Sequence, residues 1–117
     1  MELSHMILKD LKSSKFQLVF DYIYKTKRYI IRVPSGFVTD FASIPHIMQA
    51  FISPYGKSNA ASVIHDWLYS KKCEIKISRA EADLIFLEIL KENGVNIIKA
   101  NVMYYGVRIF GVKQYKN

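Results

Sequence analysis

A histidine and two aspartates stand at spacings that could support acid–base chemistry. His65 and Asp66 are adjacent in the segment from Ser58 to Tyr69, and Asp83 belongs to the next segment. A carboxylate that binds one nitrogen of an imidazole fixes its tautomer and leaves the other nitrogen to accept a proton. If the two segments are antiparallel helices, Asp83 can reach His65. The sequence therefore predicts His65 and Asp83 as candidate catalytic residues.

The segment from Ser58 to Tyr69 has the apolar spacing of a helix. His65 falls on the shoulder of its apolar stripe, Tyr69 follows one turn later, and Asp66 is directed toward a different neighbour. A histidine in such a place can equally be an inert interior residue. The stripe recurs at intervals of three and four residues and consists of Ala60, Ala61, Val63, Ile64, Trp67 and Leu68.

A second helix is predicted from its start signal. Ser78 and Glu81 have the spacing of a capping box, and Gly94 marks the end of the pattern. Asp83 lies at the edge of the buried stripe. Arg79, beside the capping box, could pair with Asp66 or contact a phosphate. The stripe itself is formed by Ala82, Ile85, Phe86, Ile89 and Leu90.

A loop from Thr39 to Pro45 offers two further candidates, Asp40 and Ser43. Asp40 either caps a turn or joins Asp66 near the histidine, where carboxylate oxygens would suit a hard divalent ion such as Ca²⁺ or Mg²⁺. Ser43 is a possible nucleophile, but no Gly-x-Ser-x-Gly pattern surrounds it. We therefore favour Ser43 as the N-cap of a short helix over residues 44–51.

The order of these residues resembles that of the phospholipase A2 superfamily. The matching motifs are His65-Asp66-x-x-Tyr69 and, on the following helix, Ala82-Asp83-x-x-Phe86. The resemblance implies that His65 activates water, that Asp83 orients it, that Asp66 binds calcium and that Tyr69 supports the network. The chain departs from the superfamily in its calcium loop, because residues 53–57 contain one glycine where the superfamily is glycine-rich.

A second resemblance covers more of the chain. Residues 36–45, the motif His65 to Tyr69 and the run Arg79 to Asp83 are similar to an uncharacterised family of small phage and prophage proteins. That resemblance implies an origin in a bacteriophage or an integrated phage element. It implies no activity.

Composition limits the remaining possibilities. A chain of 117 residues, half of them hydrophobic, suits one domain over residues 1–117, with residues 1–6 as a cloning remnant or disordered start. A net charge of +7 indicates either a solvated basic surface or an anionic partner, which would be phospholipid, another anionic surface or nucleic acid. The single Cys73 fits a reducing compartment. No signal peptide or transmembrane stretch is apparent, which predicts the bacterial host cytoplasm or the virion.

The remaining elements complete an α+β prediction. Aromatic and β-branched runs between Phe16 and Val33 indicate an N-terminal β-hairpin or small antiparallel sheet, and residues 37–39 a further short extended piece. A third helix is predicted from Asn96 to Phe110, apolar over most of its circumference and therefore largely interior. Two function classes follow: a divalent-ion-dependent ester hydrolase, or a non-enzymatic phage accessory or morphogenesis protein in which the same polar residues form a structural network.

Overall fold

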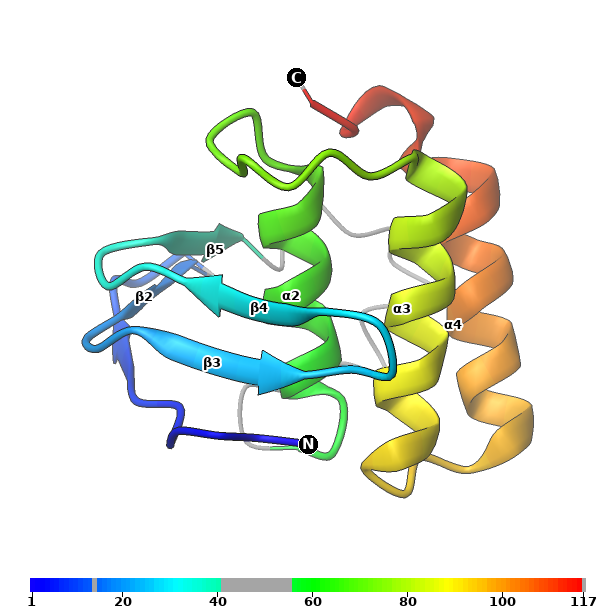
Figure 1. Ribbon diagram of the computed structural model, residues 1–117, viewed down its shortest axis with the longest axis horizontal. Coiled ribbons are helices and arrows are strands. Elements are labelled where there is room, and N and C mark those ends of the chain that lie inside the picture. The colour runs from blue at the N-terminus through cyan, green and yellow to red at the C-terminus, as the bar shows by residue number, and fades with distance from the viewer. Residues whose placement is uncertain (14, 41–55, 117) are drawn as a thin grey trace.

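The computed structural model describes residues 1–13, 15–40 and 56–116. Short antiparallel strands come first and three helices follow, which confirms the predicted α+β class. The strands cover one side of the helical layer, and both chain ends lie at its periphery (Figure 1). In this described part, no helix is both long and apolar enough to cross a bilayer.

The strands form two small sheets rather than one. β3 (Tyr22–Lys25) pairs antiparallel with β4 (Ile30–Val33), which is the hairpin that the sequence predicts. β2 (Lys15–Leu18) instead lies between β1 (Leu8–Asp10) and β5 (Val38–Asp40). The predicted extended piece at residues 37–39 corresponds to β5, whereas β1 is not anticipated by the sequence pattern.

Asp21 lies between β2 and β3, where the chain leaves the three-stranded sheet and enters the two-stranded one. Its carboxylate accepts hydrogen bonds from the Ser35 backbone N at 2.7 Å and from Arg32 Nε at 2.8 Å. These contacts join the chain before β3 to the turn after β4. The Ser35 and Arg32 hydrogen bonds also lower the pKa of the Asp21 carboxyl, so the joint is charged at neutral pH.

Alternating side chains attach the β3–β4 hairpin to the helices. Tyr22 pairs with Val33 and Tyr24 with Ile31, and all four side chains are fully buried. Successive residues of a strand point to opposite faces, so these four share the face that enters the core. The first residues of the chain lie beside β3, where the Ile23 backbone N donates to Ser4 Oγ at 2.8 Å.

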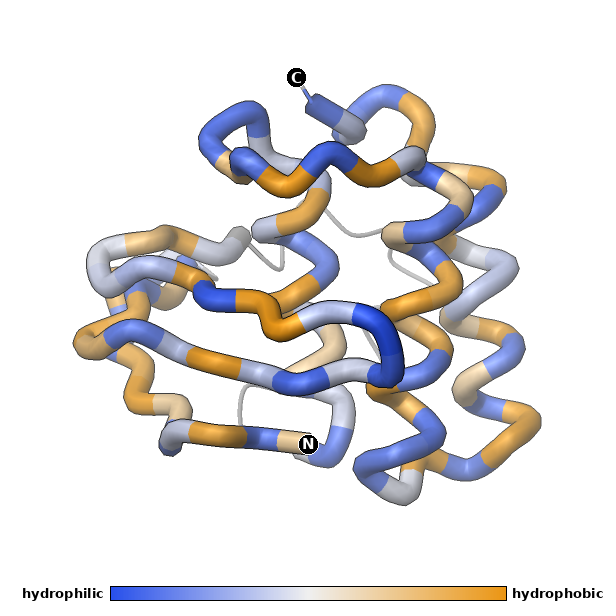
Figure 2. Tube along the Cα trace, viewed as in Figure 1, coloured by the Kyte–Doolittle hydropathy of each residue, from blue (hydrophilic) through white to orange (hydrophobic). Residues whose placement is uncertain are grey.

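The helical layer consists of α2 (Asn59–Tyr69), α3 (Arg79–Glu92) and α4 (Ile97–Phe110), followed by the short 3-10 turn η2 (Gly111–Lys113). α2 and α3 run antiparallel and lie side by side, as predicted (Figure 1). Their apolar stripes face each other and supply much of the core, and hydrophobic positions recur along both helices (Figure 2).

The predicted burial of the third helix is wrong. Within α4, only Ala100 and Met103 are buried. α4 lies at the edge of the layer, against α3, so one flank is covered and the opposite side faces solvent (Figure 1). Several large apolar side chains of α4 are therefore exposed: Ile97, Ile98, Val102, Tyr105, Ile109 and Phe110.

The start of α3 keeps half of the predicted capping box. Ser78 Oγ accepts a hydrogen bond from the Glu81 backbone N at 3.1 Å, as an N-cap should. The Glu81 carboxylate is directed to the hairpin instead, where it accepts from Tyr29 Oη at 3.1 Å and from Arg28 Nη1 at 3.3 Å. The start of α3 is thus joined to the β3–β4 turn.

The end of α3 depends on Gly94. Its φ of +82° lies in the left-handed region, and the Val95 backbone N reaches back to the Leu90 carbonyl at 3.0 Å. We expect Gly94→Ala to lower the free energy of unfolding by about 1 kcal/mol, because a Cβ is disfavoured at this φ. Urea denaturation measures the change, and Gly36→Ala, at φ +88° in the turn before β5, should cost a similar amount because the same backbone conformation is disfavoured there, away from any helix end. An unchanged stability in Gly94→Ala would contradict the assignment of this helix cap.

Candidate functional site

The centre of the candidate site is a contact between α2 and α3. His65 Nε2 lies 2.7 Å from Asp83 Oδ1. The Asp83 carboxyl is fully buried, and the His65 residue is 7% exposed. The structure thus brings together the two residues that the sequence singles out, through the antiparallel packing of the two helices.

Two further donors hold the Asp83 carboxylate. Tyr69 Oη donates to Oδ1 at 2.6 Å from the helix turn after His65. Arg108 Nη1, on α4, donates to Oδ2 at 2.7 Å. One carboxylate therefore joins three helices. Sequence reasoning places Tyr69 in this network but misses Arg108, whose role depends on how α4 packs.

The contacts of Asp83 decide its ionisation. Burial by itself raises the pKa of this carboxyl, but the hydrogen bonds from His65, Tyr69 and Arg108 outweigh burial and bring its pKa below the ordinary value. The same contacts act in the opposite sense on one donor, because burial and the hydrogen bond to Asp83 raise the pKa of the Tyr69 hydroxyl. Asp83 is therefore the anion and Tyr69 the neutral donor at neutral pH.

The ionised carboxylate fixes the tautomer of His65. A carboxylate only accepts hydrogen bonds, so Nε2 of His65 carries the hydrogen that it donates to Asp83. In a neutral ring held this way, Nδ1 is the nitrogen with a lone pair. The imidazole is also held by aromatic contacts, with ring centroids 4.1 Å from Tyr69 and 4.8 Å from Phe86. The packing of α2 on α3 thus sets the orientation of the ring.

Asp66 points away from this pair, as the helix geometry predicts. Its Oδ2 accepts a hydrogen bond from Thr39 Oγ1 of β5. This contact ties α2 to the three-stranded sheet. The next residue along β5 is Asp40, the second predicted metal ligand, but the Asp40 side chain and all of Ser43 lie outside the described residues, as does the predicted short helix at 44–51.

Arg79 makes a different contact from either predicted one. Its Nη2 donates to the backbone carbonyl of Val107 at 2.9 Å and to that of Arg108. Both carbonyls belong to the last turn of α4, at the negative end of the helix dipole, where a cation is favourable. Arg79 therefore supports the site indirectly, because it fixes the backbone of Arg108, which holds Asp83.

The described residues do not by themselves make a metal centre. Across residues 1–13, 15–40 and 56–116, no three His, Cys, Asp or Glu side chains are grouped so that they could hold an ion. Asp66 supplies one carboxylate, and Ca²⁺ takes six to eight oxygens. A divalent ion would need ligands beyond those described.

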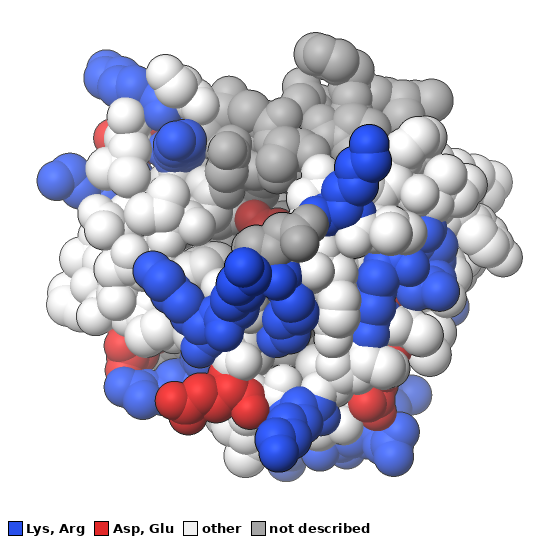
Figure 3. All heavy atoms as spheres, turned by 90° about the horizontal axis from the view of Figure 1, so that it is seen from above, with Lys and Arg blue, Asp and Glu red and all other residues white. Residues whose placement is uncertain are grey.

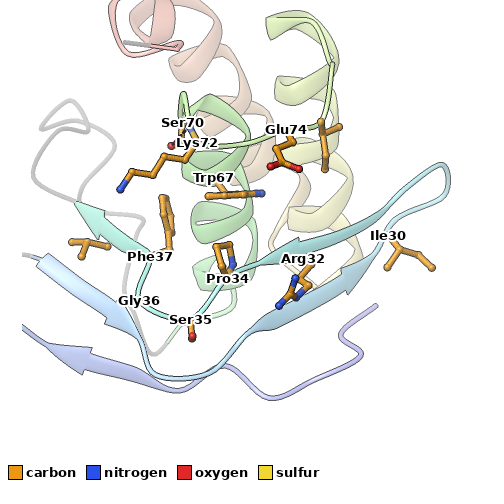
Figure 4. A pocket seen from close by; sticks show the side chains of 12 residues that line it. Ile30, Arg32, Pro34, Ser35, Gly36, Phe37, Trp67, Ser70, Lys72 and Glu74 are labelled. Atoms are coloured by element: carbon orange, nitrogen blue, oxygen red, sulfur yellow. Dashed lines mark hydrogen bonds between the residues drawn. The ribbon is translucent and has the colours of Figure 1, made fainter.

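A pocket lies elsewhere, between the β4–β5 turn and the loop after α2. It has a volume of about 930 Å³, and neither His65 nor Asp83 lines it. Trp67 and Phe37 meet there edge to face, with ring centroids 5.3 Å apart. Lys72 and Glu74 rise from the loop on one side, and Arg32 lies on the other (Figure 4).

Comparison with known proteins identifies a family but no activity. A search of curated proteins and a search of solved structures each found no match. A family model described as "Protein of unknown function (DUF1353)" matches residues 16–107. This result confirms the predicted membership of an uncharacterised family. Because the match spans most of the 117 residues, the chain belongs to the DUF1353 family.

Proposed function

We propose that this protein is a hydrolase in which His65 removes a proton from water and Asp83 holds the imidazole. The proposal depends on one observation: a buried carboxylate, fixed by Tyr69 and Arg108, accepts from Nε2 of His65 at 2.7 Å. An imidazole whose tautomer and direction are set in advance loses little freedom on reaching the transition state.

The reaction follows from the charges. Nδ1 of His65 takes a proton as the water oxygen bonds to an ester carbonyl carbon. The imidazolium that forms lies against the Asp83 anion, whose low pKa keeps the proton on the ring. When the bond from carbon to the leaving oxygen breaks, Nδ1 returns the proton to that oxygen. The products are an acid and an alcohol, and His65 regains its starting state.

The substrate class and origin are proposed from the sequence and its charge. The order of His65, Asp66, Tyr69 and Asp83 resembles the phospholipase A2 superfamily, which supports an ester of the phospholipid type. The net charge of +7 favours an anionic partner. The sequence from Gly36 to Asp83 supports a phage or prophage origin, and hence a place in the host cytoplasm or the virion.

Ester hydrolysis tests the proposal directly. The purified full-length protein should hydrolyse p-nitrophenyl butyrate, a soluble ester, faster than buffer alone, and should release fatty acid from short-chain phosphatidylcholine. Product formation is followed by absorbance and by titration of the acid. A protein that is folded by circular dichroism yet cleaves neither ester would contradict a water-activating role for His65.

The proposed divalent ion has a separate test. If Asp66 and Asp40 bind Ca²⁺ or Mg²⁺, the ion should stabilise the native state by about 2.7 kcal/mol at a concentration one hundred times its Kd. Thermal unfolding with and without each ion measures the effect. Asp66→Asn should abolish it while still accepting from Thr39, and Asp10→Asn, at an exposed carboxylate, should not. An ion effect that survives Asp66→Asn would exclude Asp66 as a ligand.

A structural role is the second candidate, and one observation favours it. Asp83 is fully buried and its contacts connect α2, α3 and α4. In that case the chain would be a phage accessory or morphogenesis protein, and the same residues would serve stability alone. The two candidates differ in the expected behaviour of His65 variants.

A further inference from the structure

The solvent-facing side of α4 is largely apolar, which indicates that it contacts something other than water. Ile98, Val102, Tyr105 and Ile109 follow one another at spacings of four, three and four residues, so they share one face of the helix. Their exposed fractions are 73%, 42%, 62% and 67%. We call these four residues the apolar α4 face. Hydrophobic positions recur along this helix in Figure 2.

The apolar α4 face is continuous and slightly hollowed. A shallow groove of about 530 Å³ runs along it and is lined by all four residues together with Phe110. Phe110, the last residue of α4, and Val112, in η2, add apolar surface at the end of the helix, with exposed fractions of 51% and 62%. Contiguous apolar surface of this kind marks a place where a protein meets another protein or a membrane.

Charge distinguishes between these partners. The chain after Glu92 contains no Asp or Glu but four cations: Lys113 and Lys116 near the C-terminal turn, Arg108, which is paired with Asp83, and Lys99 in the first turn of α4. The α2–α3 loop adds exposed Lys71, Lys72 and Lys76 against one exposed carboxylate, Glu74. The loop and the C-terminal turn are neighbours, because Lys116 Nζ donates to the Ser70 carbonyl at 3.0 Å. Figure 3 views this end of the molecule, where Lys and Arg outnumber Asp and Glu on the described surface.

We propose that the apolar α4 face and this basic end together bind the surface of an anionic lipid bilayer. Apolar side chains enter the region between headgroups and acyl chains, and the lysines lie against the anionic headgroups. A second copy of the chain fits less well, since it would cover the apolar α4 face without giving the basic end an anionic partner. Nucleic acid fits less well, since its charged backbone provides no apolar surface for the exposed isoleucines to contact.

The helix that carries the proposed surface also contributes to the candidate site. Arg108, which holds Asp83 at 2.7 Å, directly precedes Ile109 of the apolar α4 face. Consecutive residues of a helix point in different directions, so Arg108 turns toward Asp83 while Ile109 faces solvent, and α4 connects the binding surface to the network that holds His65. Binding does not require the chemistry, so His65→Gln should still bind vesicles if the hydrolase proposal alone fails.

Vesicle flotation of the full-length protein tests the proposal. The protein should float with vesicles of phosphatidylcholine and phosphatidylglycerol, float more weakly with phosphatidylcholine alone, and be released as salt is raised. Ile109→Glu should weaken binding to the anionic vesicles by about tenfold or more, since it removes apolar contact and adds repulsion. Ile30→Glu is the matched control, because Ile30 is 65% exposed on β4 and should not affect binding.

Each other outcome overturns the proposal. Flotation that is absent, or that is equal in Ile109→Glu and Ile30→Glu, would exclude the apolar α4 face. A dimer in light scattering that Ile109→Glu dissociates, without vesicle binding, would assign the face to a second copy. Binding of duplex DNA with no vesicle binding would assign the basic end to nucleic acid. Ile98→Ser, checked by circular dichroism, repeats the test without an added charge.

Discussion

Replacing His65 by glutamine should reduce ester hydrolysis by about a hundredfold or more and leave the fold intact. The glutamine side chain reaches about as far as Nε2 of His65, so its amide can donate to Asp83 Oδ1 in the same way. It has no basic nitrogen to take a proton from water. Initial rates with p-nitrophenyl butyrate and thermal unfolding by circular dichroism measure the two effects on the same preparation.

His5→Gln is the matched control for this variant. His5 is exposed and near the start of the chain, so the same change there should alter neither rate nor stability. The two candidate functions then separate clearly. An active protein whose rate survives His65→Gln has its base elsewhere. A variant that melts much earlier than the wild type would favour the structural role instead.

Removing the Asp83 carboxylate should destabilise the protein by about 3–5 kcal/mol, since deletion of one partner leaves buried donors unpaired. Asp83→Ala removes the acceptor of three hydrogen bonds, which are donated by His65, Tyr69 and Arg108. The Arg108 side chain is 33% exposed, so water can recover part of its loss and the effect should fall toward the lower limit. Urea denaturation gives the free energy of unfolding.

Glu74→Ala controls for the loss of a negative charge as such. Glu74 is exposed on the α2–α3 loop, and substitutions at such places usually change stability by less than about 0.5 kcal/mol. A comparable small effect of Asp83→Ala would show that the buried network contributes little, and would remove the basis for both candidate functions.

The difference in stability between the wild type and Asp83→Asn should depend on pH in the acid range. The pKa of Asp83 is lower in the folded chain than its ordinary value, so the ionised form stabilises the native state. That contribution is complete above about pH 4, where the unfolded carboxyl is ionised, and is lost as pH falls through the lower, folded pKa. The stability difference between wild type and Asp83→Asn should therefore shrink below about pH 4. A difference in stability that stays the same as the pH falls would contradict the lowered pKa of Asp83.

The sequence predicts α2, α3 and the β3–β4 hairpin because their signals are local. A stripe of apolar residues, a serine N-cap and a terminal glycine each act within a few residues. The meeting of His65 with Asp83 needs one more step, the antiparallel packing of adjacent helices, which their short connection favours. Membership of an uncharacterised family also follows from short motifs.

Other features depend on contacts between distant parts of the chain. α4 is apolar on nearly every side, so its sequence does not tell which side packs on α3 and which faces solvent. The contact of Arg108 with Asp83 depends on that same choice. Likewise, β2 could pair with β3 or with β5, and the register between Phe16 and Thr39 decides where Thr39 meets Asp66.

Trp67 supplies an optical probe of the joint between sheet and helices. It is the single tryptophan of the chain, and it packs edge to face on Phe37, with its ring at the wall of the pocket in Figure 4. Its intrinsic fluorescence therefore reports on that joint and on any molecule that enters the pocket, independently of the events at His65 and α4. A screen for small ligands of this pocket needs no label beyond the native indole.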